Sequence, residues 1–84
     1  MKIIYYYNNT CKCCKDYIDT VNRLGEYLLC GVMSYDIDVT KPKYEIKGIP
    51  TVIIVDDNDD ILYQNTGNLK FEFLKDDVRK NMKR

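Results

Sequence analysis

The chain has 84 residues, of which 45% are hydrophobic and 31% are charged, the balance of a folded globular chain rather than a disordered one. The 13 basic and 13 acidic side chains cancel, so the composition gives no support for a nucleic-acid or membrane-surface partner. We expect a single domain over residues 1–84, acting as a monomer.

The first expected element is a strand over residues 2–7, whose β-branched and aromatic residues hardly alternate with polar ones. That pattern is typical of a strand covered on both faces. Asn8-Asn9-Thr10 breaks the pattern and offers side chains that cap a helix. Apolar residues then recur at helical spacing, at Cys14, Tyr17 or Ile18, Val21, Leu24 and Leu28. Gly25 or Gly31 is expected to end this helix.

Residues 32–39 alternate between apolar and polar side chains and predict a second strand. Residues 40–47 contain Pro42 and are expected to form one or two helical turns. Residues 51–55 are continuously apolar apart from Thr51 and predict a buried strand.

The acidic stretch at residues 56–60 predicts a tight turn, and residues 61–64 predict the returning strand of a hairpin. After Gly67 a final helix is expected, because Phe71, Leu74, Val78 and Met82 share one helical face. The order β-α-β-α-β-β-α predicts an α/β fold with a parallel pair followed by antiparallel strands.

Cys11 and Cys14 lie where the first strand pattern gives way to the helical one. A thiol at the first turn of a helix faces unpaired backbone N–H groups and the positive end of the helix dipole, which favour the thiolate. Lys12 and Lys15 add positive charge nearby. Because a thiol one turn later can reach the first, the pair can form a disulfide reversibly. The motif predicts thiol–disulfide chemistry.

Two segments in this order resemble the thioredoxin and glutaredoxin superfamily: Cys11-Lys12-Cys13-Cys14-Lys15 and Lys43-Tyr44-Glu45-Ile46-Lys47-Gly48-Ile49-Pro50-Thr51. Gly67 also matches a family glycine beside the active site. The resemblance implies a thioredoxin fold, with a four-stranded mixed sheet flanked by helices on both faces. It further implies that Cys11 is the nucleophile, that Cys14 resolves the mixed disulfide, and that Pro50 is cis and sits against the cysteines.

The same resemblance implies a substrate-binding rim around the two catalytic thiols. The residues expected to contact substrate are Lys12, Cys13, Ile49, Pro50, Thr51, Thr66 and Gly67. The buried acid that assists proton transfer in thioredoxins falls at Tyr5, and its lysine partner at about Ser34. Proton transfer from Cys14 is therefore expected to rely on water or on a tyrosine hydroxyl.

The leading prediction is a thiol–disulfide oxidoreductase that reduces protein disulfides with a Cys11–Cys14 dithiol and has no other cofactor. A thioredoxin reductase or glutathione would return the oxidised pair to the dithiol. One alternative is a glutathione-dependent glutaredoxin. Another is a non-enzymatic module that binds thiols, zinc or copper, although no metal site is expected.

Two further cysteines remain open. Cys13 is a bystander, an alternative resolving thiol or a metal ligand, and a Cys11–Cys13 bond within one helical turn would be strained. Cys30 is expected to be a small buried hydrophobe.

The compartment is predicted from the start of the chain and from its cysteines. No apolar run approaches the roughly 20 residues of a membrane span. Met1-Lys2 leads directly into a strand pattern without a secretory signal region, so a cytoplasmic location is expected. In that compartment clustered cysteines favour catalysis or metal binding.

Overall fold

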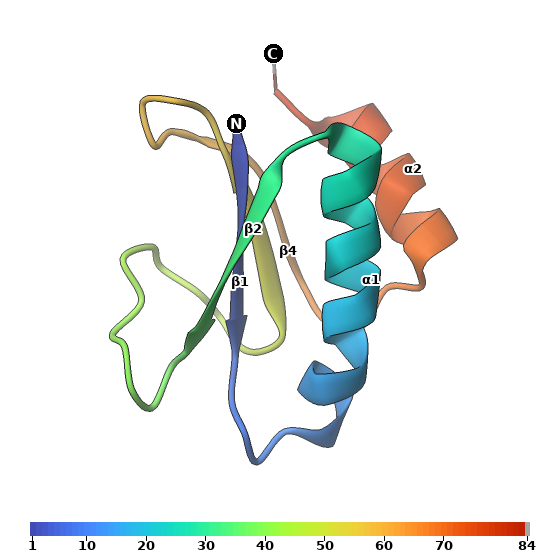
Figure 1. The fold of residues 1–84 in the computed structure, drawn as a ribbon. Helices are drawn as coiled ribbons and strands as arrows, with labels where there is room; N and C mark the ends of the chain where they lie inside the picture. The colour runs from blue at the N-terminus through green and yellow to red at the C-terminus, as the bar shows by residue number, and fades with distance from the viewer. Residues whose placement is uncertain (84) are drawn as a thin grey trace.

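The computed structural model of the protein describes residues 1–83, so Arg84, the last residue of the expected domain, lies outside the described residues. The helices and strands follow in the order β1 Lys2–Tyr7, α1 Lys12–Leu28, β2 Gly31–Asp36, β3 Thr51–Val55, β4 Ile61–Thr66 and α2 Phe71–Asn81. Figure 1 shows the twisted sheet with both helices on one side of it.

The four strands form one mixed sheet in the order β2-β1-β3-β4. β1 runs parallel to β2 and antiparallel to β3, and β3 pairs antiparallel with β4. The parallel pair requires a crossover, which α1 provides, whereas a short turn is enough to join β3 to β4. β1 and β3 are the interior strands, which explains their nearly unbroken apolar sequences. The predicted four-stranded mixed sheet is confirmed.

Both helices pack on the same face of this sheet and bury the larger part of the core (Figure 1). The buried side chains of this cluster are Ile3, Tyr5, Tyr17, Val21, Leu24, Val52, Ile54, Tyr63, Leu74 and Val78. Full burial of one such aliphatic side chain stabilises the fold by roughly 1.5–3 kcal/mol, so the cluster fixes α1 firmly against β1. Within residues 1–83, no helix is long and apolar enough to cross a membrane.

The opposite face of the sheet is covered by residues 37–50 in a non-helical conformation. The predicted short helix within residues 40–47 is therefore wrong, and so is the expectation of helices on both faces. Tyr44 and Ile46 both pack against the buried side chains of β1 and β3 on this face. Residues two apart share a side only when the backbone is extended, so the packing of Tyr44 and Ile46 on the same cluster opposes a helix here. Pro42 also lacks the N–H group that a helical hydrogen bond would need.

α1 continues past Gly25 to Leu28, so Gly25 does not end the helix. A Cβ atom at Gly25 would lie 2.8 Å from Val32 Cγ2 and 3.1 Å from the carbonyl oxygen of Cys30. Glycine is therefore required here by the close approach of α1 to the start of β2. The helix ends at Leu29, whose φ of 55° lies in the left-handed region.

Two strand ends differ from the predicted ones. β2 stops at Asp36 rather than continuing to Val39. The Asp36 side chain accepts a hydrogen bond from the Asp38 N–H at 2.9 Å, and its carbonyl accepts one from the Val39 N–H at 3.1 Å, which turns the chain away from the sheet. β4 instead extends two residues beyond Gln64, so that Thr66 lies opposite Thr51.

Candidate active site

The loop between β1 and α1 places Cys11 as the N-cap residue of the helix. Asn8 Oδ1 accepts hydrogen bonds from the Thr10 N–H at 2.8 Å and the Thr10 hydroxyl at 2.7 Å. The Cys11 N–H donates to the Asn8 carbonyl at 3.0 Å. The cap itself is the Cys11 sulfur, which accepts from the Cys14 N–H at 3.3 Å. Residues 8–10 were expected to cap the helix, but Cys11 is the cap. Residues 8–10 instead shape the loop that leads into the helix.

The environment of Cys11 favours its thiolate. Its pKa lies below the ordinary 9.0, chiefly because the Cys14 side chain hydrogen-bonds to its sulfur. Partial burial works in the opposite direction, but hydrogen bonds from the Cys14 backbone and from Cys13 lower the pKa further. A hydrogen-bonded sulfur at a helix N-terminus carries negative charge more readily than one in water. Cys11 is also partly exposed, so a substrate sulfur can reach it.

Cys14 has the opposite environment. Only 1% of its surface is exposed, and burial is the main reason that its pKa rises from 9.0 to about 11. The hydrogen bond to Cys11 raises the pKa further, because it stabilises the protonated form of the Cys14 thiol. Cys14 is therefore a thiol near neutral pH. The two residues form an asymmetric pair with one accessible nucleophile and one shielded thiol.

Cys13 lies beside this pair and is exposed. Its sulfur is 3.7 Å from the Cys11 sulfur. Lys12 is exposed as well, so both residues predicted to contact substrate between the two thiols face solvent.

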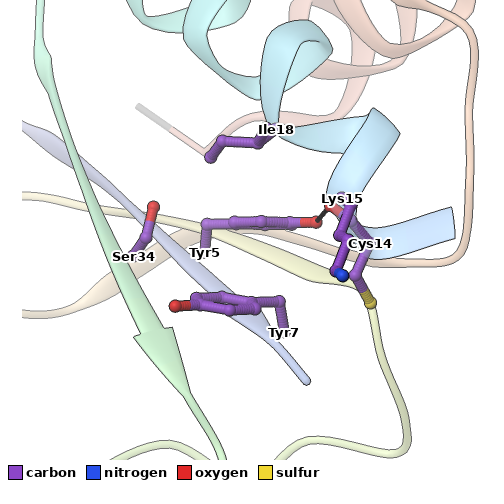
Figure 2. A pocket seen from close by; sticks show the side chains of 6 residues that line it. All are labelled: Tyr5, Tyr7, Cys14, Lys15, Ile18 and Ser34. Atoms are coloured by element: carbon purple, nitrogen blue, oxygen red, sulfur yellow. Dashed lines mark hydrogen bonds between the residues drawn. The ribbon is translucent and has the colours of Figure 1, made fainter. Parts of the chain in front are cut away.

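A cavity of about 260 Å³ adjoins Cys14 between α1 and the strands β1 and β2 (Figure 2). It is lined by Tyr5, Tyr7, Cys14, Lys15, Ile18 and Ser34. Tyr5 and Ser34, the positions of the family's acid and lysine, thus lie at one cavity with Cys14. The Tyr5 hydroxyl donates to the Cys14 carbonyl at 2.6 Å, and Figure 2 shows the Cys14 sulfur pointing away from the Tyr5 ring.

Tyr5 is poorly suited to accept the Cys14 proton. Its pKa is raised, chiefly by burial, so the hydroxyl keeps its own proton over the neutral range. That proton is also directed to the Cys14 carbonyl rather than to the thiol. Of the two routes expected for proton transfer from Cys14, the Tyr5 hydroxyl is therefore the less suitable one.

Lys15 was expected only as positive charge near the thiols, and Ile18 only as an apolar residue of the helix, yet both line the cavity. Spacing could have found Ile18, since it follows Cys14 by four residues and so shares its face of α1. Tyr7 follows Tyr5 by two residues and shares its face of β1 by the same argument. Their rings stack with centroids 5.8 Å apart.

Pro50 lies at the end of the sheet from which the Cys11 loop leaves β1. Thr51 pairs with Tyr6, one residue before the end of β1, and Pro50 precedes it. The Ile49–Pro50 peptide bond is cis, and the Pro50 carbonyl accepts a hydrogen bond from the Gly67 N–H at 2.9 Å. The topology therefore brings the proline segment and Gly67 to the same end of the molecule as the cysteines.

The residues of the expected substrate rim differ in exposure. Thr66 is exposed, and Ile49 and Gly67 are partly exposed. Pro50 and Thr51 are buried. The Thr51 hydroxyl donates to the Gly48 carbonyl at 2.5 Å and lies 2.9 Å from the Thr66 hydroxyl, so it holds the segment together from inside.

Cys30 lies at the far end of α1 from the other three cysteines. The helix has 17 residues, so its two ends are roughly 25 Å apart at 1.5 Å per residue. Cys30 is partly buried and packs against the main core, as expected of a small hydrophobe. Among residues 1–83, no three or more His, Cys, Asp or Glu side chains are grouped so that they could hold a metal ion.

No family model matches the chain, and no curated protein matches it in sequence. Solved structures do match. Thioredoxin 1 from Thermosipho africanus is 21% identical with a TM-score of 0.76, over 95% of this chain and 92% of that protein. The chain has the thioredoxin fold.

Other thioredoxins of this fold are equally similar. A mutant thioredoxin from Halobacterium salinarum matches with a TM-score of 0.79 at 21% identity, over 99% of this chain and 75% of that protein. The germline-specific thioredoxin Deadhead from Drosophila melanogaster matches with a TM-score of 0.75 at 23% identity, over 94% of this chain and 78% of that protein. The predicted resemblance is therefore confirmed for the fold.

Proposed function

We propose that the chain is a thiol–disulfide oxidoreductase that reduces protein disulfides through the Cys11–Cys14 dithiol. The observation that carries this proposal is the asymmetric pair at the tip of α1. Cys11 is accessible and has a lowered pKa, whereas Cys14 is shielded and protonated one helical turn away. The thioredoxin fold supports the same assignment.

The proposed reaction has two exchange steps. The Cys11 thiolate attacks one sulfur of the substrate disulfide, which forms a mixed disulfide and releases the other substrate sulfur as a thiolate. Cys14 then loses its proton and attacks the Cys11 sulfur, forming the Cys11–Cys14 bond and releasing the second substrate sulfur. The substrate gains two electrons and the dithiol loses two.

The substrate segment is proposed to lie along the exposed Thr66 and the partly exposed Ile49 and Gly67, with Lys12 and Cys13 at its other side. Pro50 and Thr51 act from beneath, since both are buried and the hydrogen bonds to Thr66 and Gly67 hold this edge in shape. An extended peptide that runs along such an edge adds backbone hydrogen bonds as well as side-chain contacts.

The Cys11–Cys14 disulfide is the only redox group that the proposal requires. A thioredoxin reductase or glutathione would restore the dithiol. We place this cycle in the cytoplasm, where reducing systems keep most thiols reduced. We propose a monomer, and the equal numbers of basic and acidic side chains give no support for a nucleic-acid or membrane-surface partner.

The test is insulin reduction with dithiothreitol as electron donor. Cys11→Ser is expected to abolish it, because a serine hydroxyl is not ionised at neutral pH and cannot form the mixed disulfide. Cys30→Ser is the matched control and is expected to remain active, since Cys30 lies at the other end of α1. Full activity in Cys11→Ser would refute the assignment.

The electron donor is decided by a second assay. The oxidised protein is supplied with NADPH and either thioredoxin reductase or glutathione with glutathione reductase, and NADPH consumption is followed. Turnover with thioredoxin reductase alone supports the thioredoxin-like assignment. Turnover that requires glutathione identifies the glutaredoxin alternative, and stoichiometric zinc or copper in protein purified under reducing conditions identifies the metal-binding one.

A further inference from the structure

Cys13 is a third thiol at the reaction centre, and the two-thiol cycle does not use it. Its sulfur lies 3.7 Å from the Cys11 sulfur, and its side chain is exposed. Any substrate bonded to Cys11 would therefore have Cys13 within reach of the mixed disulfide.

The backbone between the two residues permits a bond. Lys12 is the first residue of α1, and helical geometry at that residue sets the Cα atoms of its two neighbours about 5.4 Å apart. Disulfides span Cα separations of about 4.4–6.8 Å. The strain expected from the sequence therefore depends on where the side chains point, and the short distance between the sulfurs shows that they point toward each other.

Cys14 is shielded from solvent, whereas Cys13 is exposed. Before it attacks, Cys14 must lose a proton from a site that is 99% shielded from solvent, and burial raises its pKa to about 11. The neighbouring Tyr5 hydroxyl donates its hydrogen bond to the Cys14 carbonyl, and Ser34 stands at about the position of the lysine that the family resemblance places there. Cys13 is exposed, so its thiol is in direct contact with water.

We propose that Cys13 is a second resolving thiol that competes with Cys14 for the mixed disulfide on Cys11. This inference rests on the proposed function, because it takes Cys11 as the nucleophile.

In this step the Cys13 thiolate attacks the Cys11 sulfur. The Cys11–Cys13 bond forms, and the bond between Cys11 and the substrate sulfur breaks. The proton of Cys13 goes to water, and the departing substrate thiolate takes a proton from water. As in the two-thiol cycle, the substrate disulfide gains two electrons, which come here from Cys11 and Cys13.

The test uses the full chain with Cys30→Ala, which removes the remote thiol, and less than one equivalent of an aromatic disulfide that releases a coloured thiolate (Ellman's reagent). Attack by Cys11 releases the first thiolate, and resolution releases the second. Cys14→Ser is expected to release both, whereas Cys13→Ser/Cys14→Ser is expected to stop after the first and to keep the reagent bound, as seen by mass spectrometry.

The proposal is overturned if Cys14→Ser stops after the first release, as the double variant does, while Cys13→Ser completes both. That result leaves the proposed function intact with Cys14 as the only resolving thiol. The proposed function itself fails if Cys11→Ser reduces insulin at the full rate. The two failures are therefore distinct.

The unmutated chain provides a readout that does not depend on whether Cys14→Ser folds. The reaction is quenched early with acid, and free thiols are labelled with a maleimide in denaturant. The disulfide is then reduced and the chain is cut after Lys12 and Lys15. A label on Cys14 within the Cys13-Cys14-Lys15 peptide marks a Cys11–Cys13 bond and is the expected early product. Label on Cys13 alone at all times overturns the proposal.

Discussion

Cys11 and Cys14 lie within one turn of α1, yet their pKa values move in opposite directions. Cys11 is the N-cap, where its sulfur accepts hydrogen bonds, and Cys14 is the first buried position of the helix. The hydrogen bond from the Cys14 thiol to the Cys11 sulfur lowers the pKa of Cys11 and raises the pKa of Cys14. One short peptide segment thus separates the nucleophile from its shielded partner.

We expect the alkylation rate of Cys11 by iodoacetamide to rise with pH through a midpoint below 9.0, the ordinary value for a thiol. The sign follows because only the thiolate reacts, and a lowered pKa populates it at lower pH. The measurement is site-resolved labelling by mass spectrometry from pH 5 to 10. Cys13→Ala should move the midpoint upward, since it removes the Cys13 thiol, whose hydrogen bond to the Cys11 sulfur contributes to the lowered pKa. A Cys11 midpoint at or above 9.0 would contradict this account.

At the scale of elements, α1 is positioned by its contact with the start of β2. Gly25 lies inside the helix and against Val32, which allows the helix backbone to approach the sheet closely. This contact adds to the packing of Tyr17, Val21 and Leu24 in the main core, which fixes α1 along its length.

Gly25→Ala is expected to destabilise the protein by about 1 kcal/mol. Overpacking against Val32 and the Cys30 carbonyl costs about 1–3 kcal/mol, which exceeds the helix-propensity gain of alanine. Urea denaturation followed by circular dichroism measures the change.

Gly31→Ala is the matched control. It is expected to stabilise the protein by about 0.4–1 kcal/mol, because nothing lies within 4 Å of the added Cβ and the backbone of Gly31 does not have a positive φ. Equal stabilisation by both substitutions would show that α1 and β2 are not in close contact at Gly25.

Local patterns in the sequence were sufficient for most elements but not for Gly25 or for residues 40–47. The apolar runs of β1 and β3 and the spacing along both helices predicted those elements, because their periodicity reports burial directly. Gly25 was one of two candidate helix ends, with Gly31, since nothing local in the sequence reveals that Val32 packs against it. The helix predicted within residues 40–47 is wrong because the contacts of Tyr44 and Ile46 with the sheet are long-range, and no local pattern in the sequence reports them.

The candidate site shows the same division. The CxxC spacing at a strand-to-helix junction predicted which thiols lie together, and the resemblance to the thioredoxin and glutaredoxin superfamily implied that Pro50 lies against them. The approach of the Cys13 sulfur to Cys11 depends on side-chain rotamers, which spacing does not specify.

At the scale of the whole molecule, the sheet is covered differently on its two faces. Two helices cover one face, and residues 37–50 cover the other with a smaller cluster of apolar side chains. The second cluster depends on few residues, so each is expected to contribute visibly to stability.

Ile46→Ala is expected to destabilise the protein by about 1–2 kcal/mol, less than a fully buried isoleucine would cost because Ile46 is only partly buried. The measurement is again urea denaturation. Val39→Ala is the control from the same segment and is expected to change stability by less than about 0.5 kcal/mol, since Val39 is 82% exposed. Equal effects of the two substitutions would show that residues 37–50 do not seal this face.

Residues 37–50 leave and rejoin the sheet at neighbouring positions beside β1. The Ile37 N–H donates to the Tyr7 carbonyl at 2.9 Å, and Thr51 lies opposite Tyr6. Asn8 Nδ2 also donates a hydrogen bond to Asp38 Oδ2 at 2.8 Å, so residues 37–50 begin beside the loop that leads to Cys11. Extra residues between the same two junctions would therefore lengthen a surface excursion that is tied to the Cys11 loop through Asn8, while the pairing of all four strands stays as it is.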